Sequence, residues 1–296
     1  MGSSKESILK TLLYSDIFDY PLRSEEIWKF LISGNKEDKQ SFLKYLNLKN
    51  NFFDCKNNLY FINGRAALVK KRQEKEKHSF KKIKLAKKII QKLSLIPTVY
   101  FIGISGALAM KNSDKDDDID LFVITARDSV WTTRLMMVIM LNFMRVYRKR
   151  NEENVSNKIC LNMFVDDSAL AFPKDRIDLY TAHEITQILP IFNKDMIYEK
   201  LINSNIWIKD FLPNAFSQKS IIPFVSKTSF FNKVINYLLR IPIIEFITRN
   251  IQFRYMKKHI TRETISNNFL AFHPFDYKKH VLKNYKKKIT KYVYSI

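Results

Sequence analysis

The sequence predicts an α+β fold, with a small mixed β-sheet core among helices, an N-terminal domain of helices and a hairpin, and a helical C-terminal region. Three observations predict it. Apolar residues recur at helical spacing in the first 50 residues, short β-rich apolar runs occupy the middle of the chain, and the last third combines helical spacing with many lysines. A chain of 296 residues with 46% hydrophobic residues has room for two domains and enough apolar side chains for a packed core.

Residues 1–65 are expected to form the N-terminal domain. Helical spacing predicts two helices within 5–31 and a third over about 36–48. "FFDCKNNLYFING" (52–64) has two short apolar runs around a Lys-Asn-Asn turn, a pattern typical of a β-hairpin. Three helices followed by a hairpin is the order of a winged helix-turn-helix. Such domains bind DNA or proteins, and both alternatives stay open here.

The rest of the chain divides into three expected parts. Residues 66–96 are predicted to form a basic linker helix, because they contain no Gly or Pro and Pro97 follows them. Residues 97–216 are predicted to form the core domain that contains the β-sheet, and residues 217–296 are predicted to form a basic helical region. The expected elements of the core are strands at 98–105, 119–125 and 159–167, a helix at about 129–147 and a further helix within 175–192.

The net charge of +22 is concentrated in two segments. Residues 66–92 carry 11 Lys and Arg against 2 Glu, and residues 217–296 carry 16 Lys and Arg against 3 acids, so the remainder is neutral. Two basic surfaces beside a neutral body favour an extended polyanion such as nucleic acid as partner. The alternative is a compositional bias in which lysines fill exposed helix faces.

Cysteine usage and hydropathy favour a cytoplasmic protein. Cys55 and Cys160 lie far apart in sequence without metal-ligand spacing, which indicates reduced thiols, and the first residues lack the apolar core of a signal peptide. The apolar stretches 130–144 and 230–247 are interrupted by charged residues. We therefore predict buried or half-buried helices there and no transmembrane span. Contact of these helices with a membrane surface is an alternative that we do not expect.

The stretch "SGALAMKNSDKDDDIDLFVIT" (105–125) carries the strongest chemical signal. Asp118 and Asp120 enter a predicted strand with one residue between them, so their side chains should lie on the same side, about 6–7 Å apart along the chain. Two such carboxylates suit a hard divalent cation, Mg²⁺ or Mn²⁺. The small residues Ser105, Gly106 and Ala107 precede them where a strand turns into a helix, and small residues there let backbone N–H groups approach a triphosphate.

These residues resemble the DNA polymerase β-like nucleotidyltransferase superfamily. Its signature is Gly followed by Gly or Ser, about ten residues, and Asp-hydrophobic-Asp/Glu-hydrophobic, which matches Gly106–Ala107 and Asp118-Ile119-Asp120-Leu121 with residues 108–117 between. The whole chain looks more loosely like bacterial nucleotidyltransferase-domain proteins with an N-terminal winged helix and a basic helical tail. Two positions differ from the pattern. Ala107 replaces the second Gly or Ser, and Asn162 stands where the family has a third carboxylate on a later strand.

The resemblance implies Mg²⁺-dependent transfer of a nucleoside monophosphate from an NTP, with ATP as the expected nucleotide. Asp118 and Asp120 would bind the metal, and Asn162 would complete the catalytic set. The acceptor would be an RNA or DNA end or a protein hydroxyl. The alternative is a catalytically degenerate protein that senses nucleotide and binds nucleic acid, as a regulator or a toxin–antitoxin-like component, and Asn162 favours it.

Four further residues are candidates for contacts with the nucleotide. Lys111 is expected to steer phosphates or to screen the aspartates, and Arg134, within an apolar helix, to neutralise phosphate or pair with an aspartate. His183 and Glu184, on a predicted helix, are candidates for a base or a ribose contact, with a helix-end cation and a surface acid as the alternatives.

Overall fold

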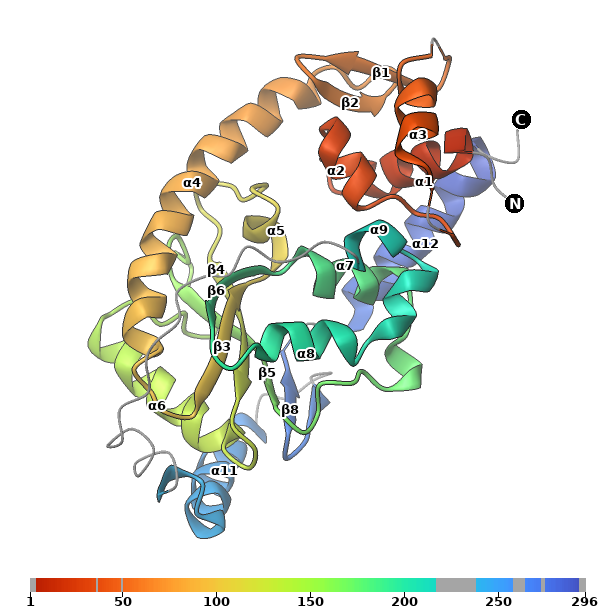
Figure 1. Ribbon diagram of the computed structural model, residues 1–296. Helices are drawn as coiled ribbons and strands as arrows, with labels where there is room; N and C mark the ends of the chain where they lie inside the picture. The colour runs from red at the N-terminus through yellow and green to blue at the C-terminus, as the bar shows by residue number, and fades with distance from the viewer. Residues whose placement is uncertain are drawn as a thin grey trace.

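The computed structural model describes residues 4–35, 37–48, 50–216, 238–257, 264–272 and 275–292. Within these residues the architecture is mixed α and β, as the sequence predicts, with helices around one six-stranded sheet and a separate two-stranded hairpin (Figure 1). The strand order in the sheet is β6-β3-β4-β5-β8-β7. These strands are β3 (Val99–Ile104), β4 (Ile119–Thr125), β5 (Ile159–Asp166), β6 (Leu189–Asn193), β7 (Thr264–Ile265) and β8 (Phe269–Ala271).

The three central strands position the acidic stretch. β3 and β4 are antiparallel, whereas β4 and β5 are parallel and are joined by α6 (Val130–Phe143). Side chains of β4 alternate between the two faces of the sheet. Leu121 and Val123 pack into one core, and Phe122 and Ile124 into the other. Both faces are covered, which explains why β4 reads as a nearly continuous apolar run.

Helices cover the two faces of the sheet in different ways. The long basic helix α4 (Leu68–Leu93) and α6 pack on the face of Leu121. The linker helix predicted over 66–96 is therefore present, over Leu68–Leu93. The opposite face, on the side of Phe122, is covered by shorter helices. These are α7 (Leu179–Gln187), α8 (Ile197–Asn203), α9 (Pro213–Phe216) and part of α12 (Phe275–Tyr292). A 3₁₀ turn at Lys174–Arg176 precedes α7, and another at Ile206–Asp210 lies between α8 and α9.

The N-terminal segment has the predicted three helices and hairpin. They are α1 (Ser4–Asp16), α2 (Ser24–Lys29), α3 (Lys39–Leu46), β1 (Phe53–Lys56) and β2 (Leu59–Ile62). Asp38 begins α3 by accepting a hydrogen bond from the Ser41 backbone N–H at 2.8 Å. Asn57 and Asn58 both have positive φ, which is the backbone conformation that a tight hairpin turn requires.

The C-terminal helix α12 lies against this N-terminal segment. Tyr285, Ile289 and Tyr292 pack into the core formed by α1–α3, and Lys288 forms an ion pair with Asp16 near the end of α1. Helices at opposite ends of the sequence are therefore side by side (Figure 1).

Two parts of the fold differ from the prediction. The helix predicted within 175–192 ends at Gln187, and the following residues form β6, because Ile191 and Phe192 pack into the core at the edge of the sheet. The C-terminal region is not only helical. Besides α11 (Pro242–Lys257) and α12 it contributes β7 and β8, and β8 pairs antiparallel with β5, whose outer edge would otherwise stay unpaired. The part of this prediction that covers 217–237 lies outside the described residues.

The apolar stretch 130–144 is the packed helix α6, with Trp131, Met137 and Leu141 fully buried. No helix among the described residues combines the length and the apolar character needed to cross a membrane.

Candidate active site

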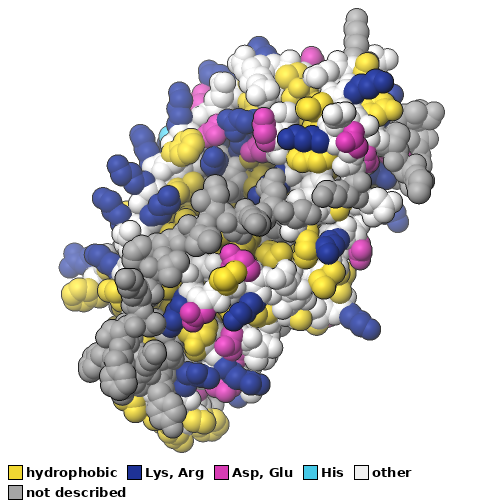
Figure 2. Space-filling model, in the orientation of Figure 1, with side chains coloured by type: hydrophobic (Ala, Val, Ile, Leu, Met, Phe, Trp, Pro, Cys, Tyr) yellow, Lys and Arg dark blue, Asp and Glu magenta, His cyan; other side chains and the backbone are white. Residues whose placement is uncertain are grey.

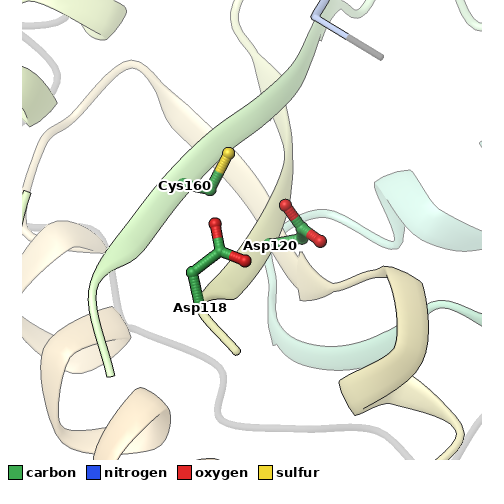
Figure 3. Close-up of side chains that lie close together, drawn as sticks. All are labelled: Asp118, Asp120 and Cys160. Atoms are coloured by element: carbon green, nitrogen blue, oxygen red, sulfur yellow. The ribbon is translucent and has the colours of Figure 1, made fainter. Parts of the chain in front are cut away.

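Three side chains meet at the start of β4 and β5. Asp118 directly precedes β4, Asp120 lies on it, and Cys160 stands opposite Asp120 on β5. Their oxygen and sulfur atoms lie within 4.8 Å of one another, and the side chains point toward a common space (Figure 3). The two aspartates therefore share one side of the strand, as their alternation predicts.

Burial and mutual repulsion shift the charge state of this cluster. Desolvation, together with the neighbouring charge of Asp118, raises the pKa of Asp120 to about 7. Desolvation and the nearby aspartates also raise the pKa of the Cys160 thiol well above its ordinary value, so the thiol is neutral near pH 7. Arg148 partly offsets the negative charge, since its Nη1 lies 2.6 Å from Oδ2 of Asp118.

The donor set fits a divalent cation held by the two carboxylates. Burial and the neighbouring charge of Asp118 both disfavour an ionised Asp120, and a divalent cation between the two carboxylates would offset this cost. Oxygen ligands suit Mg²⁺ and Mn²⁺, whereas a thiol is a soft ligand that Mg²⁺ does not prefer. Asp118 and Asp120 are thus the candidate metal ligands, and Cys160 is a neighbour of unusual type.

The turn before the acidic loop touches the cluster directly. The Ser105 backbone N–H donates to the carbonyl of Asp120 at 2.9 Å. Gly106 has φ +65°, and a Cβ atom there would lie 2.9 Å from Oδ2 of Asp120. Only glycine combines this backbone conformation with so close an approach. The turn continues into α5 (Gly106–Ala109), a single helical turn, so the strand–turn–helix order expected for 98–109 is present.

A cavity of about 260 Å³ adjoins Asp120 and the turn. It lies among α1, the segment after α1, α5, α7 and α12, so the N-terminal and C-terminal helices both form its walls. No Lys or Arg is found among its described lining residues, and six of them are Tyr or Phe. The residues are Thr11, Tyr14, Ser15, Phe18, Tyr20, Leu22, Phe30, Gly106, Ala107, Met110, Asn112, Asp120, Tyr180, His183, Glu184, Gln187 and Tyr277.

His183 is a neutral, buried member of this lining. Its ring stacks on Tyr14 with centroids 4.1 Å apart, and burial lowers the pKa of His183 to about 3. Nδ1 lies 3.1 Å from the Gln187 amide nitrogen. That nitrogen is a donor, which places the imidazole proton on Nε2. Nε2 is buried without a hydrogen-bond partner among the described residues, an arrangement that costs about 1–3 kcal/mol unless a ligand satisfies it.

Several residues predicted for the site lie elsewhere. Arg134 donates to Gln252 Oε1 at 2.6 Å and stacks over Phe272, and it does not line the cavity. Lys111 follows α5, and its ammonium lies over the ring of Phe80. In contrast, the predicted residues His183 and Glu184 do line the cavity, together with Asp120.

Asn162 is buried on β5, and its amide nitrogen lies 3.5 Å from Ser105 Oγ. It is the extra residue at a register shift, because Leu121 pairs with Leu161 and Phe122 with Met163. Cys160 is the β5 residue whose side chain joins the acidic cluster of Asp118 and Asp120. Asp166, further along β5, accepts from the backbone and side chain of Ser168 and caps a turn.

Two residues of the site are not apparent from the sequence. Cys160 has no metal-ligand spacing along the chain, whereas its partners in space come from the adjacent strand. Arg148 lies in a polar loop with many charges, and nothing in the sequence distinguishes it from Lys149 or Arg150.

Comparison with known proteins finds no matching family model, no matching curated protein and no matching solved structure.

Proposed function

We propose that the chain is a Mg²⁺-dependent nucleotidyltransferase that transfers a nucleoside monophosphate from an NTP, with ATP expected, to an acceptor. The observation that carries the proposal is the juxtaposition of Asp118 and Asp120 with the Gly106 turn, at the mouth of an aromatic cavity. Carboxylates beside a glycine turn that a ligand can approach closely are what the nucleotidyltransferase motif provides. On this view the core 97–216 has a nucleotidyltransferase fold and residues 1–65 a winged-helix fold.

Asp118 and Asp120 would hold the metal ion, and the positive charge of the ion would neutralise the phosphates. The chain's own residues do the positioning. Gly106 leaves room for a phosphate beside Asp120, and Arg148, already beside Asp118, adds a cation at the edge of the same site. Phosphoryl transfer depends chiefly on such positioning and electrostatic stabilisation.

The cavity is the proposed place for the nucleoside. Its described lining holds no cation to receive phosphate, but its aromatic rings offer stacking surfaces. The buried Nε2–H of His183 lacks an acceptor among the described residues, and a ring nitrogen or carbonyl oxygen of a base would supply one. His183 would then orient the base and would not act as a proton-transfer group.

The acceptor proposed first is an RNA or DNA end. α4 supports it, since Lys and Arg side chains follow its outer edge (Figure 2). These exposed lysines include Lys70, Lys77, Lys81, Lys84, Lys87, Lys88 and Lys92. Phosphate contacts by such residues attract polyanions without sequence preference. A protein hydroxyl is the second acceptor class.

A second candidate function is nucleotide sensing without catalysis. The observation that favours it is Asn162, buried on β5 beside Ser105, at the position where the resemblance implies a third carboxylate that activates the attacking hydroxyl. The neutral thiol of Cys160, opposite Asp120, does not supply that carboxylate either. Such a protein would bind MgNTP and regulate a nucleic-acid or protein partner.

Incubation with Mg²⁺ and each α-labelled NTP, with total RNA, DNA or protein alone, tests the proposal. We expect label transfer by the native chain and by Asp116→Asn, whose exposed side chain lies in the loop, and none by the Asp118→Asn/Asp120→Asn double variant. MgNTP binding without transfer in any condition would favour the sensor. If MgNTP binding is unchanged in the double variant, the metal site is wrong.

A further inference from the structure

α11 turns its polar side chains toward the protein. Glu245 accepts hydrogen bonds from the backbone N–H groups of Trp131 at 2.7 Å and Thr132 at 2.9 Å, at the start of α6. Gln252 is buried, donates to the Trp131 carbonyl at 2.7 Å and accepts from Arg134 at 2.6 Å. A surface helix ordinarily packs its apolar stripe on the core and shows its polar side to water. α11 departs from this pattern, because Glu245 and Gln252 face the protein together with the apolar Phe253 and Met256.

The outward side of α11 carries five exposed apolar side chains, together with Arg254 and Lys257 near the C-terminal end of the helix. Its exposed apolar side chains are Ile243 (59% exposed), Phe246 (57%), Ile247 (49%), Ile251 (58%) and Tyr255 (76%). With about 3.6 residues per turn these five positions fall within half of the helix circumference, and we call them the apolar arc. Hydrophobic side chains are visible at this end of the molecule (Figure 2). An exposed contiguous group of this kind marks a surface that meets a protein or a membrane.

The charge around the apolar arc distinguishes the possible partners. Arg254 and Lys257 are exposed on α11, and its one acid, Glu245, is turned inward. Residues 217–296 carry a net charge of +13, and the whole chain +22. A second copy of the chain would bring like charges together, whereas an anionic surface attracts them. Long basic side chains beside apolar ones are also the composition of helices that lie at a lipid interface.

We propose that the chain docks on an anionic lipid surface through α11, with the apolar arc inserted among the lipids and Arg254 and Lys257 at the headgroups. The polar contacts with α6 fix the helix with its apolar side outward, so docking needs no rearrangement of this helix. The proposal does not depend on nucleotidyl transfer.

Flotation of the full-length chain with vesicles tests it. The vesicles are phosphatidylcholine alone or phosphatidylcholine with about 30% phosphatidylglycerol, at low and at moderate salt. We expect flotation with the anionic vesicles only. The Phe246→Ser/Ile247→Ser variant should lose about tenfold or more of the bound fraction, as expected when two inserted apolar side chains are removed. Leu95→Ser, which changes a residue that is 71% exposed in the turn after α4, is the matched control and should float like the native chain.

Circular dichroism and thermal unfolding test whether each variant is folded. We expect each to fold, because the replaced side chains are exposed and do not support the core. The Arg254→Glu/Lys257→Glu variant should also lose flotation. Three results would overturn the proposal. They are equal flotation by native chain and Phe246→Ser/Ile247→Ser, absence of flotation with anionic vesicles, and a dimer in solution that this variant abolishes without any vesicle binding.

Discussion

Asp120 and Cys160 occupy paired positions on the adjacent parallel strands β4 and β5, and a thiol therefore faces a half-buried carboxyl group in the candidate metal site. Burial and the charge of Asp118 raise the pKa of Asp120, while its contact with Cys160 lowers it. Burial and both aspartates raise the pKa of the Cys160 thiol. A third carboxylate at Cys160 would give the cluster three oxygen-donor side chains.

Cys160→Asp should therefore strengthen Mg²⁺ binding by at least about tenfold, equal to about 1.4 kcal/mol, because a hard ligand replaces a soft one. Without metal the same variant should be less stable by about 1–3 kcal/mol, since a further acid is buried beside two others. Titration calorimetry and denaturant unfolding with and without Mg²⁺ measure both effects. Cys160→Ser is the control and should change neither by this amount. Equal Mg²⁺ affinity of Cys160→Asp and the native chain would show that a side chain at position 160 does not reach a cation held by the two aspartates.

The aspartate pair is predictable from the sequence and its partner is not, for a physical reason. Side-chain alternation along one strand is a local property, so the sequence places Asp118 and Asp120 on one side. Which residue of β5 faces them depends on strand register, which tertiary pairing sets. Cys160 pairs with Asp120 just before the one-residue irregularity at Asn162. Asn162, the residue that its hydrophobic neighbours indicate, lies two residues further along β5, with its amide nitrogen 3.5 Å from Ser105 Oγ.

Similar limits apply to the fold. Long elements with clear periodicity, such as α4, α6 and the strands β3 to β5, follow from the sequence. The prediction merges β6 into the helix before it and misses the short β7 and β8, because strands of two to five residues contain too few positions for a period to be read. The cavity is not predictable either, since its walls come from helices at both ends of the chain.

Metal binding should depend on pH through Asp120. Its pKa of about 7 in the metal-free chain means that the carboxyl must lose a proton before it can bind a cation. The affinity for Mn²⁺ or Mg²⁺ should therefore rise with pH, by up to about tenfold per unit below pH 7, and level off near pH 8. Calorimetry at about pH 6.5 in two buffers of different ionisation enthalpy should detect the released proton. An affinity that stays constant between about pH 6 and 8 contradicts this prediction.

Gly106→Ala should distort the backbone of the turn beside Asp120 and thereby weaken the site. The added Cβ would approach Oδ2 of Asp120 to 2.9 Å, and the φ of +65° is strained for alanine. We expect a loss of about 1–2 kcal/mol in stability and about tenfold weaker MgNTP binding, measured by unfolding and by calorimetry. Gly34→Ala is the matched control, because a Cβ atom at Gly34 would have no described neighbour within 4 Å, and it should change neither quantity. Equal effects of the two substitutions would show that the Gly106 contact is unimportant.

His183 should make the stability of the protein depend on pH. Burial lowers its pKa to about 3 in the folded chain, against about 6.5 when unfolded. Between these values the unfolded chain binds a proton that the folded chain does not, so the free energy of unfolding falls as the pH decreases below about 6.5. From about pH 7.5 to pH 5 this single group should cost about 2 kcal/mol.

The contribution of His183 is isolated by comparing variants in urea at both pH values. His183→Phe keeps a ring against Tyr14 but cannot titrate, so its loss of stability between about pH 7.5 and 5 should be smaller than that of the native chain by about 2 kcal/mol. Phe30→Leu removes a ring that contacts His183 and leaves the imidazole in place. It should lower stability by similar amounts at both pH values, and a native-like pH dependence in His183→Phe would show that His183 is not the group that titrates.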